Sequence, residues 1–185
     1  GFLMPNTYFF SEEPTETQLV QRMADQFKKD YAALMERYPE KATEDLVVVL
    51  TIASMIEEEA RLDDERELVS AVIHNRLKKK MRLEMDSTLQ YSLGKYGQRL
   101  LNTDKEVDSP YNTYMHTGLP PGPISNPGVK SIEAALNPAA VSFIFFVSNA
   151  DGNSHTFSST LREHNNAVAK FRREIKVQRN QQNNQ

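Results

Sequence analysis

Three consecutive carboxylates, Glu57, Glu58 and Glu59, directly follow an apolar stretch of the chain. In a helix each residue turns by about 100°, which places Glu58 on the polar side of this stretch and Glu57 and Glu59 on apolar faces. Burial raises the pKa of a carboxyl group, and a carboxyl group that stays protonated can protonate a glycosidic oxygen. The pattern alone favours a plainer alternative, in which the helix end emerges into solvent and the acids pair with Arg61 or Arg66.

A second candidate region is the proline- and glycine-rich loop at residues 109–128, which contains Asn112 and Tyr114. Aromatic rings can stack on sugar faces, amides can bond to hydroxyl and acetamido groups, and flanking prolines would hold such a site rigid. A rigid surface loop whose tyrosines cover the core is the alternative. The segment at residues 82–88, with Asp86, is open to two interpretations: helix capping with ion pairing, or the lining of a cleft.

Several other chemistries have little support in the sequence. The chain has no cysteine, which excludes disulfides, thiolate catalysis and cysteine-based zinc sites. His155, Glu163 and His164 do not have the spacing of a compact metal motif, so no metal is expected. No glycine pattern cradles a phosphate and no Schiff-base lysine is evident, so no cofactor is expected. The net charge of -3, with basic residues dispersed among acids, argues against nucleic acid.

Hydrophobic periodicity predicts a predominantly helical α+β domain at residues 1–177, followed by a disordered polar tail at 178–185. Its core helix bears Glu59, and a small antiparallel β hairpin and the loop at 109–128 complete it. The sequence contains no run of about 18 apolar residues, the length that is needed to span a membrane. Because the chain opens on Gly1, we expect it to be part of a longer precursor. The predicted elements, in chain order, are an extended segment or strand at 1–10, helices from Thr15 to Tyr38, Thr43 to Ala60, Asp64 to Lys80, Asp86 to Leu93 and Ser131 to Leu136, a buried strand at 142–148, its hairpin partner at 155–158, and a last helix from Thr160 to about Lys176.

Several short motifs occur together in the order found in one family of cell-wall enzymes. They are Ile56–Ala60, His74–Leu77, Leu83–Thr88, Tyr111–Gly128, His155–Phe157 and Glu163–Asn165, preceded by Gly1–Tyr8. Together they resemble the endolytic murein transglycosylases, the YceG-like family, over nearly the whole chain. Each motif is weak alone, whereas their combined order is specific.

The resemblance implies a protein anchored in the inner membrane by one N-terminal helix, with a small LysM-like domain and this catalytic domain on the periplasmic, extracytoplasmic side. It implies cleavage of nascent peptidoglycan between N-acetylmuramic acid and N-acetylglucosamine without water, which leaves 1,6-anhydro ends and limits glycan length. Peptidoglycan strands are the implied substrate, and peptidoglycan synthases are the implied partners. The second glutamate of the family's Glu-x-Glu motif is catalytic, and here it is Glu59.

On the same resemblance, Glu57 is expected to accompany Glu59, and the expected substrate-binding residues are Glu57, Asp86, Asn112 and Tyr114. The chain departs from the family in carrying Glu84-Met85-Asp86-Ser87-Thr88 where relatives commonly have Gln-Ser-Asp-Pro-Thr, and Pro5-Asn6 where they have Pro-Asp. Two other functions stay open at this point. One is a hydrolytic muramidase with Asp86 or Glu57 as the second carboxylate, and the other is a non-catalytic peptidoglycan-binding domain.

Overall fold

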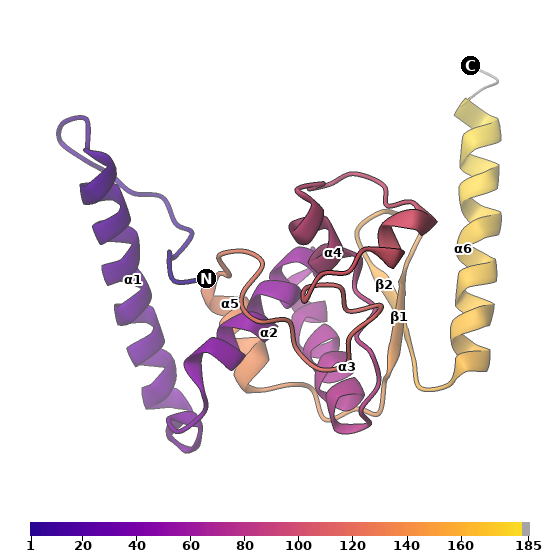
Figure 1. Cartoon of the computed structure of the whole chain (residues 1–185), viewed down its shortest axis with the longest axis horizontal. Coiled ribbons are helices and arrows are strands. Elements are labelled where there is room, and N and C mark those ends of the chain that lie inside the picture. The colour runs from indigo at the N-terminus through magenta and orange to yellow at the C-terminus, as the bar shows by residue number, and fades with distance from the viewer. Residues whose placement is uncertain (183–185) are drawn as a thin grey trace.

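The computed structural model describes residues 1–182, and within them it contains six α-helices and one two-stranded antiparallel sheet (Figure 1). This confirms the predicted α+β fold, in which helices predominate. The helices are α1 (Glu16–Arg37), α2 (Leu46–Glu59), α3 (Arg66–Lys78), α4 (Asp86–Leu93), α5 (Val129–Leu136) and α6 (Leu161–Gln182), and the strands are β1 (Phe145–Ser148) and β2 (His155–Ser158). Short 3₁₀ turns occupy Pro39–Lys41, Asp63–Glu65 and Asn102–Glu106.

Helix α2 forms the centre of the core, as its apolar composition predicts. It packs against α5, α3 and α4, and all of its residues from Val49 to Ile56 are buried. Its cap is Asp45, whose carboxylate accepts from the backbone N–H of Val47 at 2.8 Å. Because helices cover it on several sides, only its first turn and its last three residues reach the surface. The glutamates at its C-terminal end therefore stand where the core meets solvent.

Helix α1 stands to one side of this core, with the extended N-terminal segment running back along it (Figure 1). The predicted capping box is present, because Thr15 and Gln18 exchange hydrogen bonds across the first turn. Phe27 and Leu34 of the predicted stripe are buried, whereas Leu19 is 38 % exposed. Residues 1–10 form no strand, because they have no neighbouring strand to pair with; they attach to α1 through Met4 instead.

The hairpin lies between the core and α6, which packs along both strands (Figure 1). β1 pairs with β2 in the predicted antiparallel hairpin, with Phe145 opposite Ser158. The connecting turn is stabilised by Asp151, which accepts from the backbone N–H groups of Asn153 and Ser154. The prediction of a buried strand at 142–148 is wrong in extent and burial: β1 begins at Phe145 and is only half-buried, because α6 and α3 cover it incompletely.

Several element ends differ from the sequence prediction. Asp64 does not cap α3; a 3₁₀ turn precedes that helix and Glu65 occupies its N-cap without a capping hydrogen bond. Met85, and not Asp86 or Ser87, is the N-cap residue of α4. Helix α6 continues to Gln182, into the stretch predicted to be a disordered tail, because glutamine and arginine are good helix formers. Residues 183–185 of that predicted tail lie outside the described part.

Candidate active site

Glu59 is the last residue of α2, and its carboxyl group lies where two concave regions of the surface meet. The first, which we call the α4 lobe, has a volume of about 240 Å³ and is lined by Leu83–Asp86, Tyr114 and β1 residues. The second, the hairpin lobe, has a volume of about 370 Å³ and is lined by the β1–β2 turn, His155 and α6 residues. Both lobes include Glu59 and Ser148, so they adjoin at Glu59, and we call the two lobes together the groove.

The environment of Glu59 favours its protonated form. Burial raises the pKa of its carboxyl group from the ordinary value of 4.5, and the nearby charge of Asp86 raises it further. Ser87 and His155 counteract part of this rise. Among residues 1–182 no cation forms an ion pair with Glu59, and its polar neighbour is Ser87. Burial without a cation is the condition that a neutral carboxylic acid requires.

Asp86 and Tyr114 both line the α4 lobe and contact each other directly. The Tyr114 hydroxyl donates to Asp86 Oδ1 at 2.5 Å, and the Lys105 ammonium lies 4.1 Å from the centre of the Tyr114 ring. Burial and the Asp86 carboxylate both raise the pKa of Tyr114, so its hydroxyl remains a hydrogen-bond donor. Asp86 is therefore a charged neighbour of Glu59 that is already engaged with Tyr114. The two residues predicted here from the sequence do come together beside Glu59.

A buried arginine and a strained turn hold the wall of the α4 lobe in place. Arg76 of α3 donates to the carbonyl oxygens of Ile144 (2.6 Å) and Leu83 (2.8 Å), which joins β1 to the segment before α4. Glu84 adopts a left-handed backbone conformation, with φ of 51°, which is uncommon for a residue with a side chain. Thr113 fixes this turn, because its carbonyl accepts from the Glu84 N–H and its hydroxyl accepts from the Met85 N–H.

Asn112 does not face the groove, so the sequence prediction that it contacts substrate directly is not supported by its position. Its side chain is fully buried, and its amide donates to the carbonyl oxygens of Lys105 (3.0 Å) and Val107 (2.8 Å). Its Oδ1 accepts from the backbone N–H of Tyr114 at 3.0 Å. Asn112 thus shapes the loop and, through it, the placement of Tyr114.

Glu57 also lies outside the groove. Its Oε2 accepts from the Gly128 N–H (3.1 Å), the Ser131 hydroxyl (2.7 Å) and the Arg66 guanidinium (3.2 Å). These contacts tie the end of α2 to the start of α5 and to α3. The pairing with Arg66 is what the plainer interpretation of the acidic triplet predicts, and here it applies to Glu57. Glu58 is exposed, as predicted from its helical face.

Sequence reasoning assigned no functional role to His155, which lines the hairpin lobe beside Glu59. Its ring and backbone both bond to the buried Glu65, which lies far away in the sequence. The available signal was weak: His155 alternates with Phe157 along a strand, which predicts that both side chains face the same way. No local sequence pattern predicts that this histidine contacts Glu65, because the two residues are 90 positions apart.

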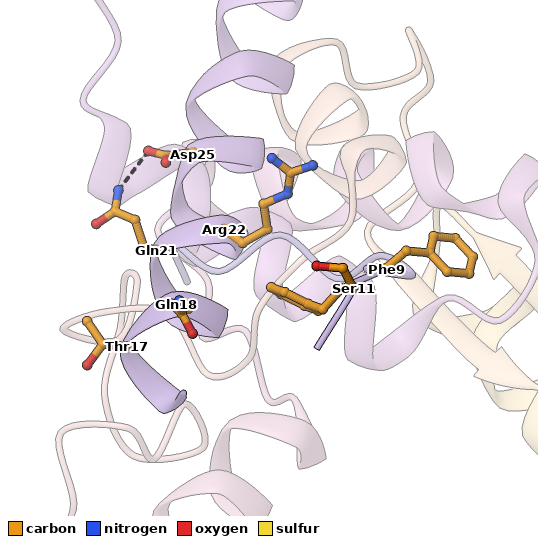
Figure 2. A pocket seen from close by; sticks show the side chains of 8 residues that line it. Phe9, Ser11, Thr17, Gln18, Gln21, Arg22 and Asp25 are labelled. Carbon is orange, nitrogen blue, oxygen red and sulfur yellow. Dashed lines mark hydrogen bonds between the residues drawn. The ribbon is translucent and has the colours of Figure 1, made fainter. Parts of the chain in front are cut away.

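A larger hollow of about 510 Å³ lies elsewhere, between the N-terminal segment and α1 (Figure 2). Its labelled side chains include Phe9, Arg22 and Gln21, which donates to Asp25 at 2.9 Å. None of its carboxyl groups combines burial with the absence of a partner, so the hollow lacks the acid that distinguishes the groove. Within residues 1–182 no helix is long and apolar enough to cross a membrane.

The fold and the groove define a class of protein: a mostly helical domain whose groove holds a partly buried carboxyl group suited to general acid–base chemistry. The chain belongs to the YceG-like family, whose pattern it matches over residues 1–170. The resemblance found from the sequence motifs is thereby confirmed.

Two curated relatives and one solved structure agree with this assignment. The chain is 40 % identical over 171 residues to the endolytic murein transglycosylase of Bacillus subtilis. The alignment covers 92 % of this chain and 47 % of that protein. It is 31 % identical over 176 residues to the endolytic murein transglycosylase of Streptococcus pneumoniae D39, and this alignment covers 91 % of this chain and 31 % of that protein. The crystal structure of a putative YceG-like protein from Listeria monocytogenes matches with a TM-score of 0.82 and 39 % identity, covering 90 % of this chain and 54 % of that chain. The chain therefore spans about half, or less, of the length of these relatives.

Proposed function

We propose that this chain is the catalytic domain of an endolytic murein transglycosylase, which cleaves the bond between N-acetylmuramic acid and N-acetylglucosamine within a glycan strand. The observation that carries the proposal is the position of Glu59 at the junction of the two lobes. A polymer lying in such a groove extends to both sides of the acid, which suits cleavage inside a strand. The names of the similar proteins from Bacillus and Streptococcus support the same activity.

The chemistry needs only one carboxyl group. Protonated Glu59 gives its proton to the glycosidic oxygen, and the bond from that oxygen to C1 of the muramic acid breaks as positive charge develops on the ring. The 6-hydroxyl oxygen of the same sugar then bonds to C1, and its proton passes to Glu59. The product is a 1,6-anhydro sugar, and the carboxyl group is restored. An internal nucleophile removes the need for a positioned water, and such reactions can gain on the order of 7–11 kcal/mol from proximity.

The α4 lobe and its loop supply the surroundings of this acid. Asp86 keeps a negative charge near Glu59, which opposes early loss of the proton. The Tyr114 hydroxyl and the Asp86 carboxylate also offer polar atoms to a sugar in this lobe. We propose that these two residues position the substrate, whereas Asn112 and Glu57 act on the scaffold around them.

Mass spectrometry of peptidoglycan digested by the protein tests the proposal. Transglycosylation leaves anhydro ends, and digestion in ¹⁸O-labelled water leaves them unlabelled. Hydrolysis leaves reducing ends that carry ¹⁸O, which would overturn the proposal in favour of a muramidase that uses Asp86 as its second carboxylate. Intact strands under all conditions would favour a peptidoglycan-binding domain.

The cellular setting belongs to the same proposal. We propose an extracytoplasmic position at the inner membrane, through an N-terminal anchor carried by a longer protein, and peptidoglycan synthases as partners. The sequence resemblance supports this setting, and the name of the Bacillus relative supports a cell-wall substrate. Fractionation of cells that express the full-length protein, followed by cross-linking, tests both points.

A further inference from the structure

Glu65 and His155 form a buried pair under the hairpin lobe, although they are 90 positions apart in the sequence. Glu65 Oε1 accepts from the backbone N–H of His155 at 2.8 Å, and Glu65 Oε2 lies 2.7 Å from His155 Nδ1. The side chains are only 10 % and 8 % exposed, respectively. A carboxylate that receives both groups of one residue fixes that residue's backbone and its ring at the same time.

The aromatic neighbours of His155 restrict the ring further. The ring of Phe146 meets it edge-on, with centroids 5.4 Å apart and planes at 88°, and Phe157 lies 6.2 Å away. Because an ionised carboxylate only accepts hydrogen bonds, Nδ1 must carry the proton that lies between Glu65 and the ring. The other ring nitrogen, Nε2, is then an acceptor in the neutral imidazole.

Nε2 of His155 is the ring nitrogen that does not bond to Glu65. It makes no hydrogen bond with residues 1–182. It is also not one of their fully buried, unpartnered side-chain atoms, so it keeps some exposure to solvent. His155 also lines the hairpin lobe together with Glu59 and Ser148. An oriented ring nitrogen that is not sealed from solvent therefore belongs to a residue that lines the same lobe as Glu59.

We propose that His155 is a further substrate-contacting residue, whose Nε2 accepts a hydrogen bond from a hydroxyl or acetamido N–H of the amino sugar in the hairpin lobe, and that Glu65 is its positioning residue. This inference rests on the proposed transglycosylase function. It gives the hairpin lobe a polar contact of its own, matching the one that Asp86 and Tyr114 give the α4 lobe. A sugar held from both lobes has its glycosidic oxygen presented to Glu59.

Two substitutions of His155 separate this contact from a purely structural role. His155→Asn places an amide near the position of Nδ1, so it can still donate to Glu65, but it has no atom at the position of Nε2. We expect kcat/KM for glycan cleavage to fall about tenfold or more, the effect of one lost hydrogen bond or somewhat more, with Tm changed by only a few degrees. His155→Gln carries an amide near the position of Nε2 and is expected to recover part of the loss. Activity of His155→Asn equal to that of the unaltered protein would overturn the proposal.

Glu65→Gln tests the positioning role. The glutamine oxygen can still accept from the His155 backbone, but its amide N–H then meets Nδ1, which must become the acceptor. The proton moves to Nε2, so that nitrogen becomes a donor and kcat/KM falls at least about tenfold. Ring ¹⁵N shifts report the change of tautomer. The matched control is Asp64→Asn in the same turn, because Asp64 is exposed and its side chain forms no hydrogen bond or ion pair with residues 1–182. An unchanged kcat/KM in folded Glu65→Gln would contradict the role.

Binding without turnover distinguishes this inference from the function on which it rests. In a Glu59→Gln background, adding His155→Asn is expected to weaken the binding of N-acetylated glycan oligomers by about tenfold. Equal affinity with and without His155→Asn would overturn the inference alone. If the unaltered protein released no anhydro ends, the proposed function would fail instead, and the affinity difference would still report the contact.

Discussion

Glu57 and Glu59 stand two residues apart at the end of one helix, yet they lie in opposite surroundings. Glu57 faces α5 and α3 and receives three hydrogen bonds, one of them from Arg66. Glu59 faces the groove, where no described cation pairs with it and burial raises its pKa. The difference teaches that the partners supplied by other elements, more than the sequence around a glutamate, decide whether it holds the fold or can act as an acid.

The largest effect is expected from Glu59→Gln, which removes the proton donor while keeping the shape of the side chain. General acid–base catalysis typically contributes about 10²–10⁴-fold, so we expect kcat to fall by about 10³-fold or more, with glycan binding retained. Release of anhydro products measured over time gives the rate. A variant that kept a tenth of the activity would show that Glu59 is not the acid, and the functional difference between Glu57 and Glu59 would no longer hold.

Glu57→Gln is expected to affect stability more than chemistry. It weakens the ion pair with Arg66 and the contacts to α5, at a cost of about 1–3 kcal/mol in the free energy of unfolding. Urea unfolding measures this cost, and Glu36→Gln, which alters an exposed and unpaired glutamate, is the control. A large loss of kcat in folded Glu57→Gln, without a change in stability, would show that Glu57 takes part in the reaction.

Glu59→Gln is also expected to change the pH dependence of stability. Because burial raises the pKa of Glu59, the folded protein holds this proton to higher pH than the unfolded chain does. The stabilisation from this proton is complete below pH 4.5 and is lost as pH rises through the raised value. Glutamine carries no such charge, so the Tm of the variant should exceed that of the unaltered protein by a few degrees at pH 8. The gain should vanish near pH 4, and a constant difference at all pH values would argue against a desolvated carboxyl group.

Asp86→Asn is expected to give the smallest change. Removing its negative charge lowers the pKa of Glu59, so the alkaline limb of the kcat/KM profile should move to lower pH by a few tenths of a unit. The asparagine oxygen can still accept from Tyr114, which preserves the contact between the two residues. Asp64→Asn is the control, since Asp64 does not influence the pKa of Glu59. A shift to higher pH would contradict the electrostatic role of Asp86.

Most of the helical fold could be predicted because its signals are local. Examples are the capping box at Thr15, the apolar character of α2 and the hairpin turn at Asp151. Each of these signals comes from residues that are close to one another in the sequence. The helix period also placed Glu58 in solvent and Glu59 on an apolar face. The strand option for residues 1–10 failed because pairing depends on a distant partner, which no local pattern contains.

The site could be predicted only in part, because its contacts join distant segments. Asp86 and Tyr114 line the α4 lobe together with Glu59, and their contact with substrate stays a prediction. The residue type of Asn112 could not show whether its amide points to a ligand or to carbonyl oxygens of its own loop. The pairing of Glu65 with His155 across 90 positions left no periodic trace in the sequence. Family resemblance selected Glu59, and its burial, which raises the pKa of its carboxyl group, supports the proposed role.

The most direct test of this account is the titration of Glu59 itself. Carboxyl ¹³C NMR of the unaltered protein, with the Glu59→Gln spectrum used to assign the resonance, follows the protonation of this one group. The account predicts a midpoint clearly above 4.5, and a lower midpoint in Asp86→Asn. A midpoint at or below 4.5 would mean that Glu59 is an ordinary solvated carboxylate near neutral pH, and the proposed acid would be contradicted.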